Sequence, residues 1–227
     1  MALANIGLYF FKRGMTTLLV DWDLEAPGLE RYFEERFHLN LPDLTQRPGL
    51  IDMIRTYLEE KKNSQAIDQD YPTLEKYLYV LDQNNDQKLM LLHAGKRSHG
   101  KLWKDYAEFV QNFDWVEFYE EWEGGAYLEW LREEFKSIAD VILIDSRTGV
   151  TEMGGVTTQH LADNLVLICG ANIENIDNTV RMAKNFTSDA IRTVRQGREL
   201  EIIVVPSRID DSDSEGDGEG DGDVGDG

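Results

Sequence analysis

The sequence predicts an α/β protein with a doubly wound, mainly parallel sheet that carries helices on both faces. Five short aliphatic runs have the length of strands and lack the polar–apolar alternation of strands that face water; they span residues 17–21, 89–93, 141–145, 165–169 and 202–206. Near-continuous aliphatic strands are typical of a parallel sheet that is covered on both faces. Helical patterns lie between these runs, and strands that alternate with helices indicate a doubly wound fold.

Two of the predicted helices are recognised by apolar residues at helical spacing. Such spacing places the apolar side chains on one face, which packs on the sheet. The stripe before the first strand consists of Leu3, Ile6 and Phe10, and the stripe before the last strand consists of Ile173, Ile176, Val180 and Ala183.

The segments 50–82 and 101–138 are predicted to be mostly helical excursions from the sheet. Eleven of the 23 aromatic residues lie between Trp103 and Phe135, several of them at helical spacing. We interpret them as the apolar face of a helical layer that packs on the sheet. An aromatic surface that binds a partner protein is the alternative interpretation.

The chain is strongly acidic, with 23 Lys+Arg and 43 Asp+Glu among its 227 residues and a formal net charge of −20. Eight of the acids lie in residues 211–227, together with six glycines and one apolar residue, Val224. Such a segment cannot bury enough apolar surface to offset the entropy of ordering it. We therefore expect one α/β domain over residues 1–210, with a helical insertion around 101–138, and a disordered acidic tail over 211–227.

Composition also excludes several classes of protein. Binding to nucleic acid or to an anionic membrane needs clustered positive charge, which this chain lacks overall. No run approaches the roughly 20 apolar residues of a membrane-spanning helix. The single cysteine, Cys169, excludes a disulfide framework. We therefore expect a cytoplasmic protein that has neither a membrane nor a nucleic acid as its partner.

Two of the predicted strands end in aspartates. The first ends at Asp21 and continues through Trp22 to Asp23, and the third ends at Asp145 and leads into a glycine-containing loop. An aspartate at the end of a buried strand is costly unless it is paired, hydrogen-bonded or near a cation. Ligands of open α/β sheets bind beyond the carboxyl ends of the strands, so a shared Mg²⁺-phosphate site is predicted. The alternative is that each aspartate only caps the turn that follows it.

Taken together, three segments resemble the MinD/ParA-type P-loop ATPases, the deviant Walker A group within the CobQ/CobB/MinD/ParA nucleotide-binding domains. The segments are ALANIGLYFFKRG (2–14), TTLLVDWDLEAPG (16–28) and DVILIDSRTG (140–149). The likeness covers most of residues 1–210. Its most specific part is the DxD that ends one strand, followed later in the chain by an aliphatic Walker B strand.

The resemblance implies ATP and Mg²⁺ as cofactors and gives roles to the strand-end aspartates. Asp21 and Asp23 match the switch I aspartates of the family, of which the second orients the attacking water. Asp145 matches the Walker B aspartate, which holds Mg²⁺ through water, and Asp21 and Asp145 are the expected metal residues. Phosphoryl transfer depends mainly on positioning and charge neutralisation, which suits this set of groups.

The resemblance also implies roles for residues beyond the aspartates. The segment from Asp145 to Gly149 matches switch II, which senses the γ-phosphate. Arg147 within it either stabilises the transferring phosphate or forms a salt bridge inside the acidic fold. Ser207 and then Arg208 stand where relatives carry an asparagine that contacts the base.

One departure from the family limits these implications. The motif KGGxGK[ST] is expected immediately before residue 2, but it is absent, and so is the strand that leads into it. The amides, lysines and hydroxyl of that motif hold the phosphates and Mg²⁺. Because the loss of one preorganised donor already costs about 3 kcal/mol of transition-state stabilisation, we expect no useful ATP hydrolysis.

Two explanations of this departure remain open. The chain is either a truncated or wrongly started version of a complete ATPase, which would bind ATP and form a homodimer once the loop is restored, or a non-catalytic scaffold that binds a protein partner. The basic loop 94–101, with Lys96, Arg97 and Lys101, is interpreted either as approaching phosphates or a second subunit, or as an ordinary exposed loop.

Overall fold

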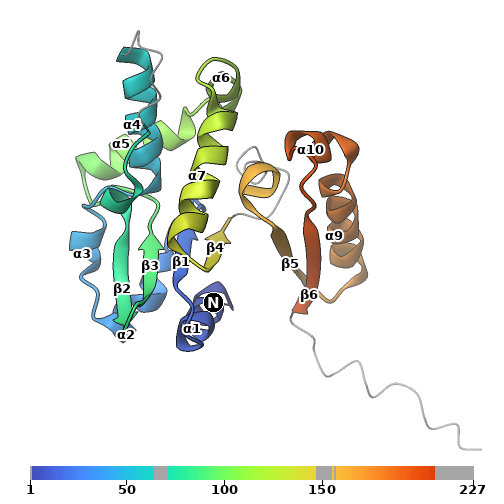
Figure 1. Ribbon diagram of the computed structural model, residues 1–227, viewed down its shortest axis with the longest axis horizontal. Helices are drawn as coiled ribbons and strands as arrows, with labels where there is room; N and C mark the ends of the chain where they lie inside the picture. Colours follow the sequence, from blue (N-terminus) through green and yellow to red (C-terminus); the bar gives the residue numbers. More distant parts are fainter. Residues whose placement is uncertain (1, 64–70, 147–154, 156, 208–227) are drawn as a thin grey trace, which may run out of the picture.

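The computed structural model describes residues 2–63, 71–146, 155 and 157–207. Among them is a four-stranded sheet with the order β2-β3-β1-β4 and a separate pair, β5-β6 (Figure 1). β1, β3 and β4 run parallel, β2 is antiparallel to β3, and β5 is parallel to β6. The predicted α/β fold class with a mainly parallel sheet is therefore confirmed. The strands are β1 (Thr17–Asp21), β2 (Tyr79–Asn84), β3 (Gln87–Leu92), β4 (Val141–Asp145), β5 (Asn164–Gly170) and β6 (Glu201–Ser207).

Helices of very different lengths connect these strands. The helices of eleven residues or more are α1 (Ala2–Lys12), α4 (Leu50–Asn63), α5 (Lys101–Gln111), α7 (Gly124–Ile138) and α9 (Ile173–Phe186). The shorter ones are η1 (Leu29–Phe33), α2 (Glu34–Phe37), α3 (Leu41–Leu44), η2 (Leu74–Tyr77), α6 (Trp115–Glu120), η3 (Thr157–Leu161) and α10 (Asp189–Val194). No helix of the described ranges is long and apolar enough to cross a membrane.

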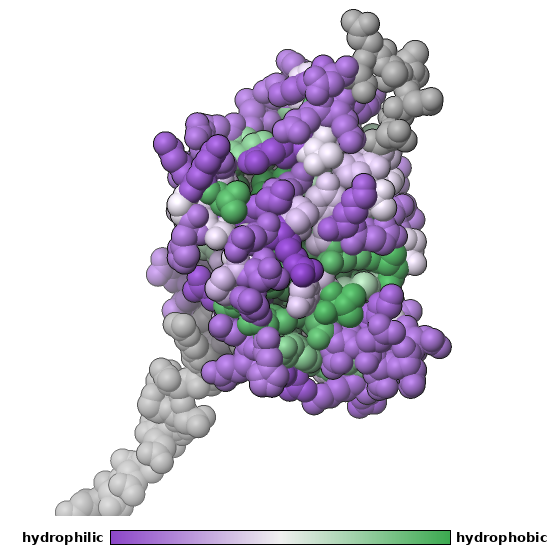
Figure 2. Space-filling view, turned by 90° about the vertical axis from the view of Figure 1, so that its left-hand side faces the viewer, coloured by the Kyte–Doolittle hydropathy of each residue, from purple (hydrophilic) through white to green (hydrophobic). Residues whose placement is uncertain are grey.

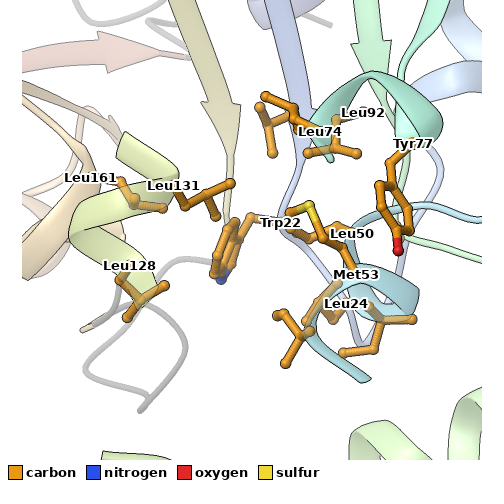
Figure 3. Close-up of a cluster of buried hydrophobic side chains, with 14 of the residues drawn as sticks. Trp22, Leu24, Leu50, Met53, Leu74, Tyr77, Leu92, Leu128, Leu131 and Leu161 are labelled. Carbon is orange, nitrogen blue, oxygen red and sulfur yellow. The ribbon is translucent and has the colours of Figure 1, made fainter. Parts of the chain in front are cut away.

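The four-stranded sheet is covered by helices on both faces, as its aliphatic strands require. On one face, Leu19 of β1 packs with residues of α1, η1 and β3. On the other face, Leu18 and Val20 pack with residues of α4, α5, α6 and α7, and Figure 3 shows part of this cluster around Trp22. All five residues of β1 are buried, which explains why its sequence does not alternate between polar and apolar residues.

The helical segment after residue 100 packs its aromatic side chains mostly inward. Tyr106, Phe118 and Tyr127 are buried in the cluster on the α4 side, whereas Trp103 is 49% exposed. This confirms the interpretation of these aromatics as a helical layer on the sheet. On the side where α3 and α4 lie, the surface is largely hydrophilic with separate apolar patches (Figure 2).

The structure corrects two expectations about the strands. Part of the segment 50–82, expected to be mostly helical, forms the antiparallel strand β2, and five of its six residues lie outside the buried core. Full burial, expected for every aliphatic strand, fails for β4, whose five residues are all partly exposed, and for β5 and β6. Leu167 and Cys169 are buried, but Val166 and Ile168 on the opposite face are 50% and 52% exposed. β6 has no buried residue, and its successive residues Ile203, Val204 and Val205 are 44%, 44% and 39% exposed, so both faces of this strand are open.

The apolar stripe predicted for α9 is also largely exposed. Ile173 is 81% exposed, and the buried side chains of this helix are Thr179 and Phe186. Among the described residues, β4 pairs only with β1 and β5 only with β6, so the sheet consists of two parts. The β5-β6 part is therefore less well buried than the four-stranded part.

A close backbone contact between α4 and β3 gives a test of the fold. A Cβ atom at Gly49 would lie 2.2 Å from the carbonyl oxygen of His93, which also accepts a 2.9 Å hydrogen bond from the amide of Leu50. Because backbone must move to admit a side chain there, we expect Gly49→Ala to lower the free energy of unfolding by roughly 2 kcal/mol or more.

The matched control is Gly125→Ala in α7, where the nearest atoms to a new Cβ are 3.9 Å away. This change should be neutral or stabilise the protein by up to about 1 kcal/mol, because alanine favours helices. Urea unfolding of both variants measures the difference. Equal unfolding midpoints for the two variants would show that this packing of α4 against β3 is wrong.

Candidate functional site

The two strand-end aspartates lie side by side. β1 and β4 pair in parallel with the register Thr17↔Val141 through Asp21↔Asp145, so both strands end at the same edge of the sheet. The amide of Trp22 extends this pairing by donating a 2.8 Å hydrogen bond to the carbonyl oxygen of Asp145. The register therefore fixes where the DxD loop leaves the sheet relative to the end of β4.

Asp21 closes the loop that follows β1. Its Oδ2 accepts hydrogen bonds from the amides of Gly28 and Leu29 at 3.0 and 3.2 Å, which agrees with a turn-capping role. Its Oδ1 is buried and has no hydrogen-bond partner among the described residues. The pKa of Asp21 is raised to about 7, mainly by burial and also by the charge of Glu30, while the Leu29 amide and Arg97 partly offset this rise. Asp21 thus caps the turn with one carboxylate oxygen, and its other carboxylate oxygen has no hydrogen-bond donor among the described residues.

The negative charge of Asp23 acts on the carboxyl group of Asp145. Burial raises the pKa of Asp145 to about 6, and the negative charge of Asp23 also contributes. Asp23 Oδ1 accepts a 3.2 Å hydrogen bond from the amide of Ala26, which holds the side chain within the loop. A cation placed near both carboxylates would favour the ionised form of Asp145.

Asp21, Asp23 and Asp145 could supply the carboxylate ligands of a magnesium site. Among the described residues, no group of three or more histidine, cysteine, aspartate and glutamate side chains is arranged to hold a metal ion. Mg²⁺ is usually held by one or two carboxylates together with waters and substrate phosphates. Asp145, Asp23 and the unpaired Oδ1 of Asp21 therefore suit a Mg²⁺-phosphate complex better than a self-contained metal centre.

The basic loop after β3 is tied into the protein. Arg97 forms a buried ion pair with Glu30 at 2.6 Å, and both side chains are at most 5% exposed. Arg97 also donates a 3.0 Å hydrogen bond to the carbonyl oxygen of Gly95. This contact anchors the loop after β1 to the end of β3, so Arg97 is neither an exposed loop residue nor available to a phosphate. Lys96 remains exposed and lines a cavity of about 460 Å³ beside α4, η2 and α5.

One pattern that resembles a phosphate-binding loop was not identified in the sequence prediction. Residues 95–101 have the spacing GxxxxGK between β3 and α5, although Leu102 stands where the motif has Ser or Thr. Three of its backbone amides, however, already donate hydrogen bonds within the protein. The amide of Gly95 donates to His93 Nδ1, that of Lys96 to Asp52 Oδ2 and that of Arg97 to the Thr45 carbonyl oxygen. A phosphate cradle needs free amides, so these three amides are not available to one.

Of the remaining predicted site residues, the structure describes only Ser207. Ser207 ends β6 in register with Gly170 of β5, on the strand pair that is separate from the aspartates. Arg147, Gly149 and Arg208 lie outside the described residues. Their roles, like the metal roles of Asp21 and Asp145, stay predictions.

Comparison with known proteins identifies the fold. No protein-family model matches the chain, and no curated protein matches it in sequence. A plasmid partition protein from Borrelia burgdorferi is similar in structure, with a TM-score of 0.57 and 14% identity over 92% of this chain and 73% of that one. Cobyrinic acid a,c-diamide synthase from Mycobacterium smegmatis has a TM-score of 0.50 and 16% identity over 92% and 69% of the two chains.

A third similar structure contains a nucleotide. The complex of a Cyanothece McdA variant with ATP has a TM-score of 0.51 and 15% identity over 90% of this chain and 63% of that one, so this chain spans less than two thirds of McdA. Identities this low establish only a common fold. The chain therefore shares the α/β fold of these proteins, with a mainly parallel sheet and helices on both of its faces.

The raised pKa of Asp21 predicts a pH-dependent stability. Its folded-state pKa of about 7 exceeds the ordinary value of 3.8, so ionisation disfavours the folded state. The contribution of Asp21 to stability is therefore full below about pH 4 and is lost as the pH rises through about 7. We expect Asp21→Asn to exceed the wild type in unfolding free energy by a few kcal/mol near pH 8 and to lose this advantage near pH 4.

Urea unfolding over this pH range measures the effect, and Asp86→Asn, in the exposed turn between β2 and β3, is the control. The difference in unfolding free energy between Asp86→Asn and the wild type should stay nearly constant over this pH range. If the unfolding free energies of Asp21→Asn and the wild type differ by the same amount at every pH, the Asp21 carboxyl group is not buried and uncompensated as described.

Proposed function

We propose that this chain is a nucleotide-dependent switch of the ParA/MinD type, with ATP and Mg²⁺ at the carboxyl edge of β1 and β4. In this proposal Asp145 holds Mg²⁺ through water, and Asp21 contributes its unpaired oxygen to the same site. Asp23 orients the water that attacks the γ-phosphate. The observation that carries the proposal is the Asp21↔Asp145 register together with the electrostatic coupling of Asp145 to Asp23.

Other groups complete the proposed site. Arg147 and Gly149 lie four residues or fewer after Asp145 in the chain and would meet the γ-phosphate. Ser207 and Arg208 would meet the base. That the McdA variant forms a complex with ATP on a similar fold supports the choice of nucleotide.

The chain carries the carboxylates of this site but no recognisable phosphate loop. The sequence has no KGGxGK[ST] stretch, and the GxxxxGK loop after β3 has three amides engaged in internal hydrogen bonds. Free amides and lysines supply most of the ground-state binding of phosphates in this class of site. We infer that these 227 residues alone bind Mg²⁺-ATP weakly and do not hydrolyse it.

A non-catalytic scaffold that binds a protein partner is the competing function. Its suggested surface was the aromatic region 101–138, but most of those side chains are packed in the core. In the part of the chain that the structure describes, the aromatic region therefore does not favour the scaffold function, which serves as an outcome of the following experiment.

Calorimetric titration with ATP and Mg²⁺ tests the proposal on two proteins, the chain as given and a version extended before Met1 by an aliphatic strand and a KGGxGK[ST] loop. We expect micromolar binding by the extended protein and binding weaker by about 100-fold or more by the chain as given, since several phosphate contacts are missing.

Variants of the extended protein separate the roles of the aspartates. Asp145→Asn should remove the dependence of ATP binding on Mg²⁺, whereas Asp23→Asn should keep binding and lose hydrolysis. No nucleotide binding by the extended protein would reject the switch function in favour of the scaffold. Micromolar binding by the chain as given would show that the missing loop is not needed.

A further inference from the structure

A second cavity, here called the outer cavity, lies at the edge of the four-stranded sheet that β2 forms (Figure 1). Its walls come from α3, the segment before α4, η2, β2 and the residue that follows β3. Its volume of about 270 Å³ is near the lower end of the range for small-molecule sites, which are mostly apolar with a few placed polar groups. The apolar and aromatic part of this wall consists of Leu44, Pro48, Tyr77, Leu78 and Tyr79.

The charged side chains that line the outer cavity are both basic. They are Arg47 and Lys76, and no aspartate or glutamate lines it. The chain has 43 Asp+Glu and only 23 Lys+Arg, so a purely basic lining runs against its overall composition. Lys76 forms no ion pair among the described residues, and Arg47 pairs there only with Asp43, at 3.5 Å and with both side chains more than half exposed. Exposed pairs contribute little, so both cations are available to an anion in the cavity.

Arg47 is held at the wall by an aromatic ring. Its guanidinium carbon lies 5.2 Å from the centroid of the Tyr79 ring, which is a cation–π contact. A guanidinium can bind a carboxylate or a phosphate through two parallel hydrogen bonds. Because the ring limits the positions of the Arg47 side chain, this guanidinium is partly preorganised for the anionic group of a ligand.

His93 contributes a buried donor to the same wall. Its side chain is 1% exposed. Its Nδ1 lies 3.2 Å from the amide nitrogen of Gly95 and 3.3 Å from Nη1 of Arg97. Both of these groups can only donate, so Nδ1 must accept, and the single proton of the neutral ring lies on Nε2.

The donor on His93 has no acceptor within the protein. Burial and then the charge of Arg97 lower the pKa of His93 to about 3, and the backbone of Pro48 and Gly95 only partly offsets this, so the ring is neutral near pH 7. Nε2 is buried and forms no hydrogen bond among the described residues. Gly95 and Arg97, which occupy the Nδ1 side of the ring, do not line the outer cavity, so the Nε2 side faces it. A buried donor without an acceptor is costly, and an acceptor in the cavity would remove that cost.

We propose that the outer cavity binds a small organic anion whose carboxylate or phosphate group accepts hydrogen bonds from Arg47, Lys76 and His93 Nε2. The apolar body of the ligand packs on Leu44 and Leu78. The site is separate from the proposed nucleotide site, because neither β1 nor β4 contributes to its lining. The inference therefore does not rest on the proposed function.

The larger cavity beside α4, η2 and α5 does not show the same preference for an anion. It shares Lys76 with the outer cavity and is also lined by Arg55 and Lys96. Three carboxyl side chains balance these charges, namely Asp52, Glu59 and Asp105. The outer cavity alone of the two combines an exclusively basic charge with a buried, unsatisfied donor.

Titration of the full chain with benzoate and with phenyl phosphate, followed through the amide signals, tests the proposal without any nucleotide. Benzylamine has the same aromatic body with a cationic group and is the matched control ligand. We expect at least one of the two anions to shift the signals of Leu44, Leu78 and Tyr79 saturably, with a Kd in the millimolar range or tighter, and benzylamine to leave them unchanged. Binding of only one anion would identify which group, carboxylate or phosphate, the site recognises.

Substitution of the two exposed cations locates the binding. Arg47→Met and Lys76→Met should each weaken binding by about tenfold or more, because each removes a charge-assisted hydrogen bond to the ligand. The matched controls are Arg36→Met, an exposed arginine that also contacts an aromatic ring, and Lys88→Met, an exposed lysine on β3. Both controls should bind the anion as the wild type does.

The ring nitrogen signals of His93 give a readout that needs no substitution. We expect the proton on Nε2 in the free protein and a shift of the Nε2 signal when the anion binds. A ring proton on Nδ1, equal binding of benzylamine, or no saturable binding of either anion in the millimolar range would each overturn the proposal. Binding that survives both Arg47→Met and Lys76→Met unchanged would overturn it as well.

Discussion

The parallel pairing of β1 with β4 is the constraint on which the site depends. Its register sets Asp21 beside Asp145, and the Trp22 amide continues the pairing beyond the last residue of β1. The strand β1 is buried throughout between two helical layers, so its position in the sheet is determined by packing on both sides. A shift of this register by one residue would separate the two carboxylates and turn their side chains to different faces.

The same packing leaves negative charge at the sheet edge incompletely compensated. Asp21 is held by two backbone amides, yet its second carboxyl oxygen is buried without a partner among the described residues. The buried ion pair between Glu30 and Arg97 fixes the loop in which Asp23 lies, but it supplies no free cation to the carboxylates. Carboxyl groups with raised pKa values at the end of a sheet are typical of sites that bind a cation or transfer protons.

Most of the strands, and the aspartates at two of their ends, could be predicted because both depend on local sequence. The aliphatic runs 17–21 and 141–145 both form strands that end in aspartate, although only the first is fully buried and the second is partly exposed. β2 escaped prediction because it is a short edge strand with mostly exposed, partly polar residues. An edge strand of this kind carries little of the periodic pattern that identifies buried strands.

Other features depend on contacts between distant residues and could not be predicted locally. The burial of Arg97 requires Glu30, and the engagement of the Lys96 amide requires Asp52 of α4. The aliphatic residues of β5 and β6 look like those of β1, but their exposure depends on which elements pack over them. Sequence periodicity indicates which face is apolar, and it does not indicate whether another element covers that face.

Binding of Mn²⁺, observed through the paramagnetic broadening of amide signals, tests the convergence of the carboxylates most directly. The account predicts that Mn²⁺ broadens the amides of Trp22, Asp23 and Ser146 first, and that Asp145→Asn removes this broadening. Broadening that is centred elsewhere on this acidic surface, or that survives Asp145→Asn unchanged, would contradict a single cation site at the ends of β1 and β4.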